Sequence, residues 1–512
     1  MTRLASPRRD GSSFPIVQAT RVAPPPRRVV GLRRLSWRAG VRRLVGTGPL
    51  VPLLGAVAIV VVAWALLVPP FQVPDESGHF GYVQSLAENG TRPGKDPPPG
   101  GRVLSTEQRA AAYLARSPQM ANEPEFKPAW DGAAERSFAA IRPRPARDDV
   151  IWVGNQSDDP PLYYAYEALV YKAASSGDLF TRLYLMRLLS GLLMLVTTAG
   201  AWLLAGELTG NDRLLQLVAA GCVGLQPMST FVSSGVNPDA LLFALSSLTL
   251  WLGVRVVRRG PTAAGVSGLV AAAGLAPLAN GRGLALAPPA ALALVLAWRR
   301  SGRRVGRSAL GVLAAVALLL AAGVASTRGL GGRLPARVDL EDLHGFASYV
   351  WQFYLPELPW QRHFPGLGAL PVWETWLKTS WAAFGSLDVR LPPQAYPVLA
   401  VLTLGTFAGA AAALARRAFR PGAAALAFGA VAVASLLLGL HWDEYWGLRH
   451  GLGSSTQGRY LLPLMPIAGV AVAAALSNLG GRGRARAAAL VLGGMAVLQL
   501  FSLAVVAGRF YA

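Results

Sequence analysis

The sequence predicts an all-α polytopic membrane protein. The chain has 512 residues, of which 53% are hydrophobic and only 15% are charged, which is more apolar than soluble domains of this length. Its apolar residues gather in runs of about twenty, the length of helix that spans a bilayer. Basic residues gather in short clusters beside these runs, and such clusters set the orientation of the helices. Together these observations predict about eleven transmembrane helices, with the N-terminus in the cytoplasm.

The predicted spans follow the apolar runs in chain order. They cover residues 48–69, 183–206, 214–233, 239–257, 262–279, 283–298, 308–326, 395–415, 422–440, 459–477 and 487–507. Gly and Pro interrupt the region 262–298, so its boundaries are weakly defined by composition. We find no internal repeat in the sequence, which disfavours transporter folds built from two related halves.

The formal net charge of +22 comes mainly from Arg residues that flank the predicted spans. Clusters within 255–259, 299–307, 416–420 and 482–486 all fall on the same side as the N-terminal tail, so this side is predicted to be cytoplasmic. Residues 1–46 hold eleven Arg and one acid, which predicts a disordered cytoplasmic tail beside anionic lipid. The basic excess therefore indicates a membrane partner, and no nucleic acid is expected.

The opposite, external side receives two large hydrophilic loops, residues 70–182 and 327–394. The first loop has fifteen acids against twelve bases, so it lacks the basic bias of a cytoplasmic loop. Residues 47–512 are accordingly predicted to form one transmembrane domain that carries both loops. The single Cys of the chain lies in an apolar run, which excludes an intrachain disulfide.

The stretch FQVPDESGHFGYVQSLAENG, residues 71–90, carries the most distinctive polar pattern. Pro74 suits the first turn of a helix, and Asp75 and Glu76 suit the positive end of its dipole. His79 lies four residues after Asp75 and three after Glu76, which predicts two carboxylates and an imidazole on one helix face. The alternative is that the two acids only favour a helix terminus beside a solvated His.

Further polar motifs fall on the same predicted external face. Ionisable groups at membrane depth are costly and tend to mark function. Each also has a structural alternative as a turn residue, a helix start or an interfacial anchor, but their joint occurrence on one face is a stronger signal than any one motif. The candidates for substrate binding are Asp159, Asn237, Asp239, Arg282, Asp388, Arg390, Gln457, Arg459 and Tyr460.

Several signatures of soluble enzymes do not occur in the sequence. It has no Gly-x-x-x-x-Gly-Lys-Ser/Thr phosphate loop, no Rossmann glycine fingerprint, no His-Glu-x-x-His helix and no Gly-x-Ser-x-Gly elbow. ATP-driven transport and serine hydrolysis are therefore disfavoured. A metal site at His441, Asp443 and Glu444 has weak support from spacing, and a solvated loop is the favoured interpretation. A lipid-borne donor suits the external face, where nucleotide-activated substrates are scarce.

Five motifs together resemble a known family: FQVPDESGHF (71–80), DPPLYYAYEALVY (159–171), GVNPDALL (235–242), FGSLDVRLP (384–392) and QGRYLLPLMP (457–466). They resemble the bacterial membrane family catalogued as domain of unknown function 2142 (DUF2142). That family is similar to the GT-C glycosyltransferases, multi-span enzymes that use polyprenyl-phosphate sugars. The resemblance covers roughly residues 50–507 and implies a location in the bacterial plasma membrane.

The resemblance also implies that an acid in the first external loop is the catalytic base, and the matching position is Asp75 with Glu76 beside it. The chain departs from the family pattern at Ser386, where an aromatic residue is expected. It departs again at Asp158 and Asp159, where Gln or His is more usual before the prolines. These departures bear on the details of the substrate.

The expected function is transfer of a sugar, with inversion, from a polyprenyl-phosphate donor to a glycan or glycolipid acceptor of the cell envelope. Asp75 is expected to take the proton of the acceptor hydroxyl, and Glu76 or His79 to tune it or to hold a divalent cation. Arg459, together with Arg282 or Arg390, is expected to stabilise the departing phosphate.

Asn237 and Asp239 are expected to bind sugar hydroxyls. Two alternatives remain at this point: a transporter or flippase for lipid-linked glycans, and a non-catalytic assembly protein.

Overall fold

The computed structural model describes residues 48–512 except residues 95, 97–103, 129–130, 142–146, 302–316, 318–320, 322–339, 365–366, 368–370 and 452–455. Residues 47–512 form one compact unit. The predicted tail, residues 1–46, lies outside the described residues, as does the predicted span 308–326 apart from two single positions.

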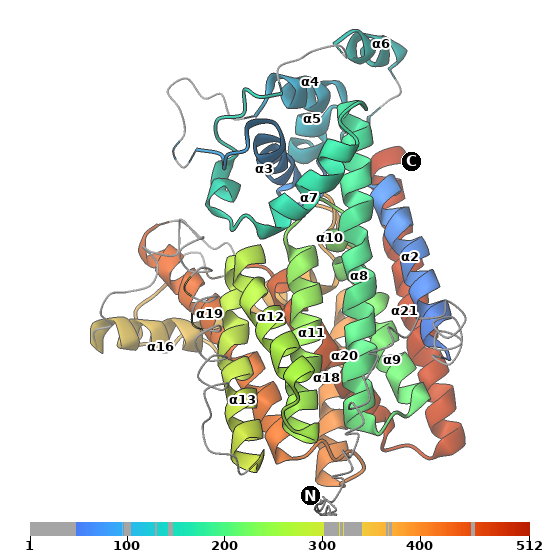
Figure 1. Ribbon diagram of the computed structural model, residues 1–512, viewed down its shortest axis with the longest axis vertical. Helices are drawn as coiled ribbons and strands as arrows, with labels where there is room; N and C mark the ends of the chain where they lie inside the picture. The colour runs from blue at the N-terminus through green and yellow to red at the C-terminus, as the bar shows by residue number, and fades with distance from the viewer. Residues whose placement is uncertain are drawn as a thin grey trace, which may run out of the picture. The chain divides into compact units, whose positions relative to one another are not determined.

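The described part of the chain is an all-α bundle (Figure 1), which confirms the predicted fold class. Eight of its helical segments are long and apolar enough to cross a membrane, and nine are if a bent pair is counted as one span. Every predicted span within the described residues coincides with a helix. The helices are α2 (Leu50–Leu67), α8 (Leu179–Thr209), α9 (Arg213–Gly224), α10 (Pro227–Ser233), α11 (Asp239–Arg259), α12 (Ala263–Ala279), α13 (Ala287–Ser301), α18 (Ala395–Ala415), α19 (Ala423–Arg449), α20 (Met465–Leu476) and α21 (Gly481–Tyr511).

Two of the spans begin as 3-10 turns, and these turns carry polar residues. The turn η2 (Gly281–Leu286) leads into α13, and the turn η4 (Gly458–Leu464) leads into α20. The third predicted span is the bent pair, because α9 and α10 meet at an angle of 59°. Pro227 stands at the first position of α10, where its missing N–H costs no hydrogen bond.

Small residues let the spans approach closely. A Cβ atom at Gly200 of α8 would lie 2.3 Å from the hydroxyl oxygen of Ser247 on α11, and Ser247 donates a hydrogen bond to the carbonyl of Thr197 at 2.8 Å. Gly253 of α11 meets the ring of Phe428 on α19 in the same way. Such contacts are the usual means of helix association in membranes, where lipid offers no hydrophobic contrast.

A polar layer covers one end of the bundle. It consists of α3 (Glu76–Asn89), α4 (Thr106–Leu114), α5 (Ser117–Asn122), α6 (Gly132–Ile141), η1 (Gly154–Asp158) and α7 (Leu162–Ala173). Figure 1 shows these helices beyond the ends of α11 and α12, with α8 continuing into the layer. Aromatic side chains of α3 and α7 form its own hydrophobic core. The layer lies within the first predicted external loop.

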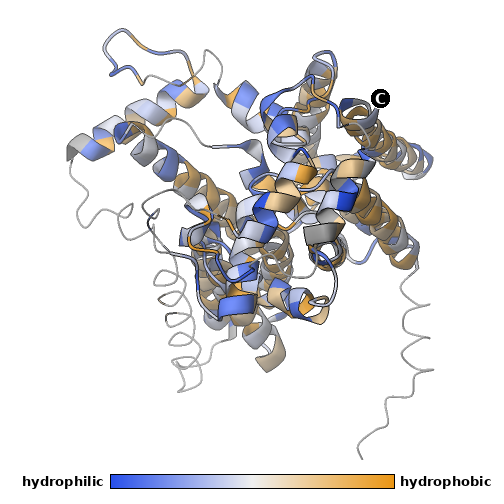
Figure 2. Ribbon diagram, turned by 90° about the horizontal axis from the view of Figure 1, so that it is seen from above, coloured by the Kyte–Doolittle hydropathy of each residue, from blue (hydrophilic) through white to orange (hydrophobic). Residues whose placement is uncertain are grey.

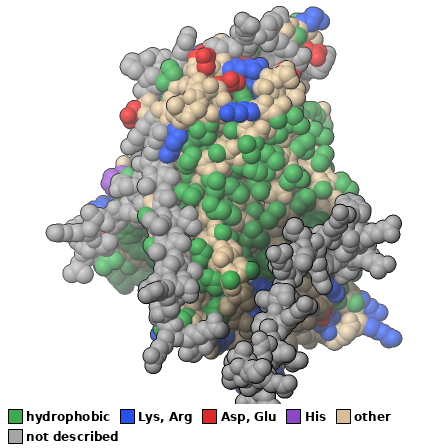
Figure 3. Space-filling view, viewed as in Figure 1, with side chains coloured by type: hydrophobic (Ala, Val, Ile, Leu, Met, Phe, Trp, Pro, Cys, Tyr) green, Lys and Arg blue, Asp and Glu red, His purple; other side chains and the backbone are tan. Residues whose placement is uncertain are grey.

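The later loop contributes three elements: α16 (Leu340–Tyr354), the π-helical turn η3 (Val372–Lys378) and the short α17 (Thr379–Trp381). Figure 3 shows hydrophobic side chains across the middle of the bundle, with charged side chains above and below them. Seen from above, the bundle helices are mainly hydrophobic and much of the overlying layer is hydrophilic (Figure 2). This distribution is the one expected of a protein with a lipid-facing belt.

Candidate functional site

Helix α3 starts one residue later than its acidic motif predicts. Its first helical residue is Glu76, and Asp75 is the capping residue in the left-handed region, with φ at 61°. A non-glycine residue is held in this region only where its surroundings compensate the strain, and such positions are common at functional sites. One compensation is a hydrogen bond from the side-chain amide of Asn237 to the carbonyl of Pro74, at 3.2 Å.

Glu76 anchors this helix start to the bundle. Its side chain is fully buried and forms a two-pronged ion pair with Arg187 of α8, with N···O distances of 2.8 and 2.6 Å. The backbone N–H groups of Phe71 and Val236 donate to the same carboxylate. Arg187 also donates to backbone carbonyls at the end of α2. Both carboxylate oxygens of Glu76 are therefore occupied, which suits a positioning role for this residue.

Asp75 faces the other way, toward the turn that starts η4. Its carboxylate accepts a hydrogen bond from Arg459 at 3.2 Å, and 47% of its side chain is exposed. The turn is held tightly because a Cβ at Gly458 would lie 2.5 Å from backbone atoms of Trp376 and Ser380. The N–H of Gly458 also donates to the Thr379 hydroxyl at 2.6 Å. Backbone contact with η3 and α17 thus fixes where the Arg459 guanidinium lies.

Two guanidinium groups lie close to the ring of Tyr460. The Arg282 guanidinium lies 4.0 Å from the ring centroid and that of Arg459 lies 5.3 Å from it. Arg282 also pairs with Asp239, which is buried at the start of α11. We call Asp75, Asp239, Arg282, Arg459 and Tyr460 the polar cluster. The structure thereby brings Asp75 and Arg459 together, although they lie 384 positions apart in the chain.

The polar cluster contains buried atoms without hydrogen-bond partners among the described residues. They are Nε and Nη1 of Arg459, Nη1 of Arg282 and Oδ2 of Asp239. Only 4% of the Arg459 side chain is exposed. Buried charged donors without partners are costly and rare, so each requires an explanation. An anion in contact with both guanidinium groups would supply acceptors for all three of these N–H donors.

Two asparagine side chains form hydrogen bonds that position residues of the polar cluster. Asn237 accepts from the backbone N–H of Asp239 at 3.0 Å, which fixes the turn before α11. Asn280 donates to the Asp239 carboxylate at 3.0 Å and accepts from the backbone N–H of Arg282 at 3.0 Å. These contacts set the position of both partners in the Asp239–Arg282 ion pair.

His79 belongs to a neighbouring chain of hydrogen bonds. Its Nδ1 lies 2.8 Å from the hydroxyl of Tyr164, and that hydroxyl donates to the Asp159 carboxylate at 2.6 Å. When Asp159 is ionised, Nδ1 of His79 must therefore carry a proton and donate it to the Tyr164 oxygen. The three residues of the Asp75, Glu76 and His79 motif thus turn to three different partners.

Burial shifts the pKa values of His79 and Asp159 in opposite directions. Desolvation lowers the pKa of His79 to about 4, although the nearby Asp75 opposes the shift, so the ring is neutral at pH 7. Desolvation raises the pKa of the Asp159 carboxyl to about 7, even though 32% of that side chain is reached by solvent. The hydrogen bond from Tyr164 opposes this rise.

Other predicted site residues have different partners. Asp388 pairs with Arg509 near the end of α21, at 3.3 Å. Arg390 is half exposed and lies 3.8 Å from Glu374. Gln457 caps η4 beside the cluster, and its buried carbonyl oxygen has no hydrogen-bond partner among the described residues. The structure therefore joins Arg282, rather than Arg390, to Arg459.

No group of three or more His, Cys, Asp or Glu side chains in the described part of the chain is placed to hold a metal ion. The predicted solvated loop at His441 is wrong, because α19 continues to Arg449 and His441 is buried. Its ring lies between the hydroxyls of Tyr349 and Tyr354, at 3.1 and 2.8 Å. Glu444 is buried and accepts two hydrogen bonds from Thr456.

Sequence reasoning missed Arg187, Tyr164 and Asn280 as contributors to the site. Arg187 had a signal, because it is an ionisable residue inside an apolar run. Its partner, Glu76, lies 111 residues away in the chain, so no sequence pattern indicates that the two residues pair. Tyr164 and Asn280 lie within or beside motifs already noted, but only the fold shows that their side chains point to candidate residues.

The family model described as "Predicted membrane protein (DUF2142)" matches residues 58–468, well over half of the chain. The chain belongs to this family. The match confirms the predicted resemblance, and the family's description names no reaction. No curated protein matches the chain.

Two solved structures are similar to the DUF2142 chain at low identity. The crystal structure of ArnT from Cupriavidus metallidurans in the apo state has 16% identity and a TM-score of 0.40, and the match covers 88% of this chain and 62% of that one. The crystal structure of the Archaeoglobus fulgidus oligosaccharyltransferase has 12% identity and a TM-score of 0.44, with 89% and 56% covered. The chain spans less than two thirds of the length of either protein.

Proposed function

We propose that this DUF2142 protein is an inverting GT-C-type glycosyltransferase, which moves a sugar from a polyprenyl-phosphate donor to a cell-envelope acceptor at the external membrane face. One observation carries the proposal: the buried Arg459 guanidinium has two N–H groups with no hydrogen-bond partner among the residues that the structure describes, and it lies beside the half-exposed carboxylate of Asp75. A guanidinium suits a phosphate, and an exposed carboxylate suits proton abstraction. The two requirements of the reaction therefore meet at one place.

In the proposed reaction, Asp75 takes the proton of an acceptor hydroxyl as its oxygen attacks the anomeric carbon of the donor sugar. A new C–O bond forms on one face of the sugar, while the bond from the anomeric carbon to the phosphate oxygen breaks on the other. The electron pair of that bond leaves with the polyprenyl phosphate. Arg459 and Arg282 stabilise the negative charge that develops on this oxygen. The products are the glycoside and polyprenyl phosphate.

The remaining cluster residues orient the substrates. Oδ2 of Asp239, which has no partner in the described part of the chain, is an acceptor for a sugar hydroxyl, and Asn237 holds the backbone around it. The Tyr460 ring contacts both guanidinium groups and so helps to fix their positions. Glu76 is assigned a positioning role, because its ion pair with Arg187 fixes the backbone that carries Asp75.

Replacing Arg459 by Gln is expected to lower the transfer rate by about 10²- to 10³-fold, the usual effect of removing a donor aimed at developing charge. The rate is measured with purified protein and a polyprenyl-phosphate sugar labelled in the sugar. Arg136→Gln on α6 is the matched control, because Arg136 is exposed and lies outside the cluster. A large loss in Arg390→Gln with none in Arg459→Gln would contradict the assignment of the phosphate site.

The affinity for the anionic donor is expected to fall as pH rises past 7. The raised pKa of Asp159 keeps this carboxyl neutral below about pH 7 and negative above it. The added charge lies near the guanidinium groups and repels a phosphodiester, which does not titrate in this range. We expect the KM for the donor to rise several-fold between pH 6 and pH 8. The same measurement on Asp159→Asn should give a flat profile, and an unchanged slope would contradict this role.

The form of the product separates enzyme from transporter. Vesicles that contain the protein are given the labelled donor together with envelope lipids and glycans. Labelled glycan with release of polyprenyl phosphate supports the proposal, whereas movement of intact donor across the bilayer without a new covalent product favours the transporter or flippase. If glycosylation continues unchanged without the cluster carboxylates but fails without the loops, an assembly role is favoured.

A further inference from the structure

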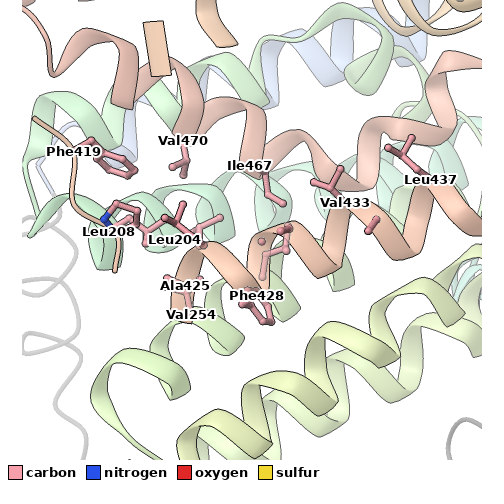
Figure 4. A pocket seen from close by; sticks show the side chains of 16 residues that line it. Leu204, Leu208, Val254, Phe419, Ala425, Phe428, Val433, Leu437, Ile467 and Val470 are labelled. Atoms are coloured by element: carbon pink, nitrogen blue, oxygen red, sulfur yellow. The ribbon is translucent and has the colours of Figure 1, made fainter. Parts of the chain in front are cut away.

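A second feature lies within the bundle, among residues that do not belong to the polar cluster. An apolar groove of about 570 Å³ runs between α8, α11, α19 and α20. Its volume is within the range of pockets that hold organic ligands. Figure 4 shows Phe419 and Leu208 near one end of the groove and Leu437 at the other. The lining side chains are hydrophobic or glycine throughout, which excludes a sugar or a nucleotide as its occupant.

The groove is elongated along α19. Its lining extends on this helix from Ala425 to Leu437, and twelve residues of α-helix rise about 18 Å. One leaflet of a bilayer contributes half of a hydrocarbon core of about 30 Å. The groove therefore has the length of a lipid chain that enters from one leaflet. Leu426 is 46% exposed, so the lining continues onto the lipid-facing surface.

The Phe419 end of the groove has a strong positive charge. Arg416, Arg417 and Arg420 are exposed on the connection between α18 and α19, which contains Phe419 itself. No described acid lies within ion-pair distance of these three residues, whereas Arg255 and Arg259 nearby on α11 share Glu207. Unpaired Arg residues at a membrane surface attract anionic headgroups.

We propose that this groove binds one acyl chain of an anionic phospholipid from the leaflet on the Arg-rich side, with the headgroup phosphate against Arg416, Arg417 and Arg420. The positive charge at one end of the groove suits an anionic headgroup, and the length of its apolar lining suits an acyl chain. The site is separate from the proposed sugar-transfer site, which is at the end of the bundle where α11 begins. It does not rest on the proposed function.

The chain offers a matched pair of glycines with which to test the groove. Gly429 lines the groove and a Cβ added there would meet no atom within 4 Å, so a larger side chain can be attached at this position without a clash at its Cβ. Gly439 lies on the same helix with equally open surroundings but does not line the groove. Gly429→Leu should fill the binding space, and Gly439→Leu should not.

The experiment titrates the lipid-depleted full chain in detergent with dioleoylphosphatidylglycerol or dioleoylphosphatidylcholine, and native mass spectrometry counts the bound lipids. We expect one phosphatidylglycerol bound at least about tenfold more tightly than phosphatidylcholine. Gly429→Leu should weaken that binding by about tenfold or more, and Gly439→Leu should leave it unchanged. Replacing the three Arg residues by Gln should bring the two lipids to nearly equal affinity.

Equal affinity of the two lipids for the unmodified chain would overturn the proposal. Unchanged phosphatidylglycerol binding in Gly429→Leu would also overturn it, as would a preference that survives the loss of the three Arg residues. The thermal unfolding of each variant is followed in the same detergent. The three Arg residues lie on an exposed connection, so this variant keeps the test open if Gly429→Leu does not fold.

Discussion

Replacing Asp75 by Asn is expected to lower the rate of sugar transfer by roughly 10²- to 10⁴-fold, the contribution of a general base. Asn has the same shape as Asp but cannot take the proton of the acceptor hydroxyl. Because 47% of the Asp75 side chain is exposed and its carboxylate accepts a hydrogen bond from Arg459 that Asn can also accept, the fold should tolerate the change. The measurement is the steady-state rate with labelled polyprenyl-phosphate sugar, with kcat and KM determined separately.

Asp131→Asn is the matched control for this experiment. The Asp131 side chain is also 47% exposed, but it lies at the start of α6 and pairs weakly with Arg116. We expect its rate to stay within a few-fold of the unmodified protein. Because a base acts in the chemical step, the loss in Asp75→Asn should appear mainly in kcat. Full activity of Asp75→Asn would remove Asp75 from the mechanism.

Replacing Arg187 by Met is expected to destabilise the protein by about 3–5 kcal/mol, the usual result of removing one partner from a buried ion pair. The change leaves the Glu76 carboxylate fully buried without its guanidinium, although two backbone N–H groups still reach it. Arg187 also satisfies three carbonyls at the end of α2, which would lose their donor. The measurement is the free energy of unfolding in mixed micelles.

Two further variants define this effect. Arg484→Met breaks an ion pair with Asp212 in which both side chains are about a third exposed, so we expect a loss of about 0–1 kcal/mol. The double variant Glu76→Leu with Arg187→Met removes the stranded charge and should recover part of the stability. Equal losses in Arg187→Met and Arg484→Met would show that the buried pair does not anchor the helix start.

The bundle could be predicted from the sequence because each span carries its own signal. A run of about twenty apolar residues has few structures available to it in lipid, and helices α2, α8, α11 and α18 occur where such runs predict them. The bend between α9 and α10 was not predicted, because its residues are as apolar as those of a straight span. The 3-10 turns η2 and η4 were also missed, since they differ from helix starts only in backbone geometry.

The candidate site could be predicted as a set of residues but not as a set of contacts. The placement of Arg282 and Arg459 on one face follows from topology, and the structure joins them through Tyr460. The partner of each residue depends on helix rotation, which hydropathy does not determine. Asp75 and Glu76 are adjacent in sequence yet point to Arg459 and Arg187, because Asp75 adopts a left-handed backbone conformation.

The contact at Gly458 connects the turn that carries Arg459 to the outer segment that contains η3 and α17. No space remains for a methyl group between this residue and the backbone of η3 and α17, so the turn that carries Arg459 is packed directly against the segment around residues 375–380. A shift of that segment would therefore also shift the turn that carries the Arg459 guanidinium. If the chain is the proposed glycosyltransferase, a molecule that moves this outer segment on binding would also change the position of the phosphate site.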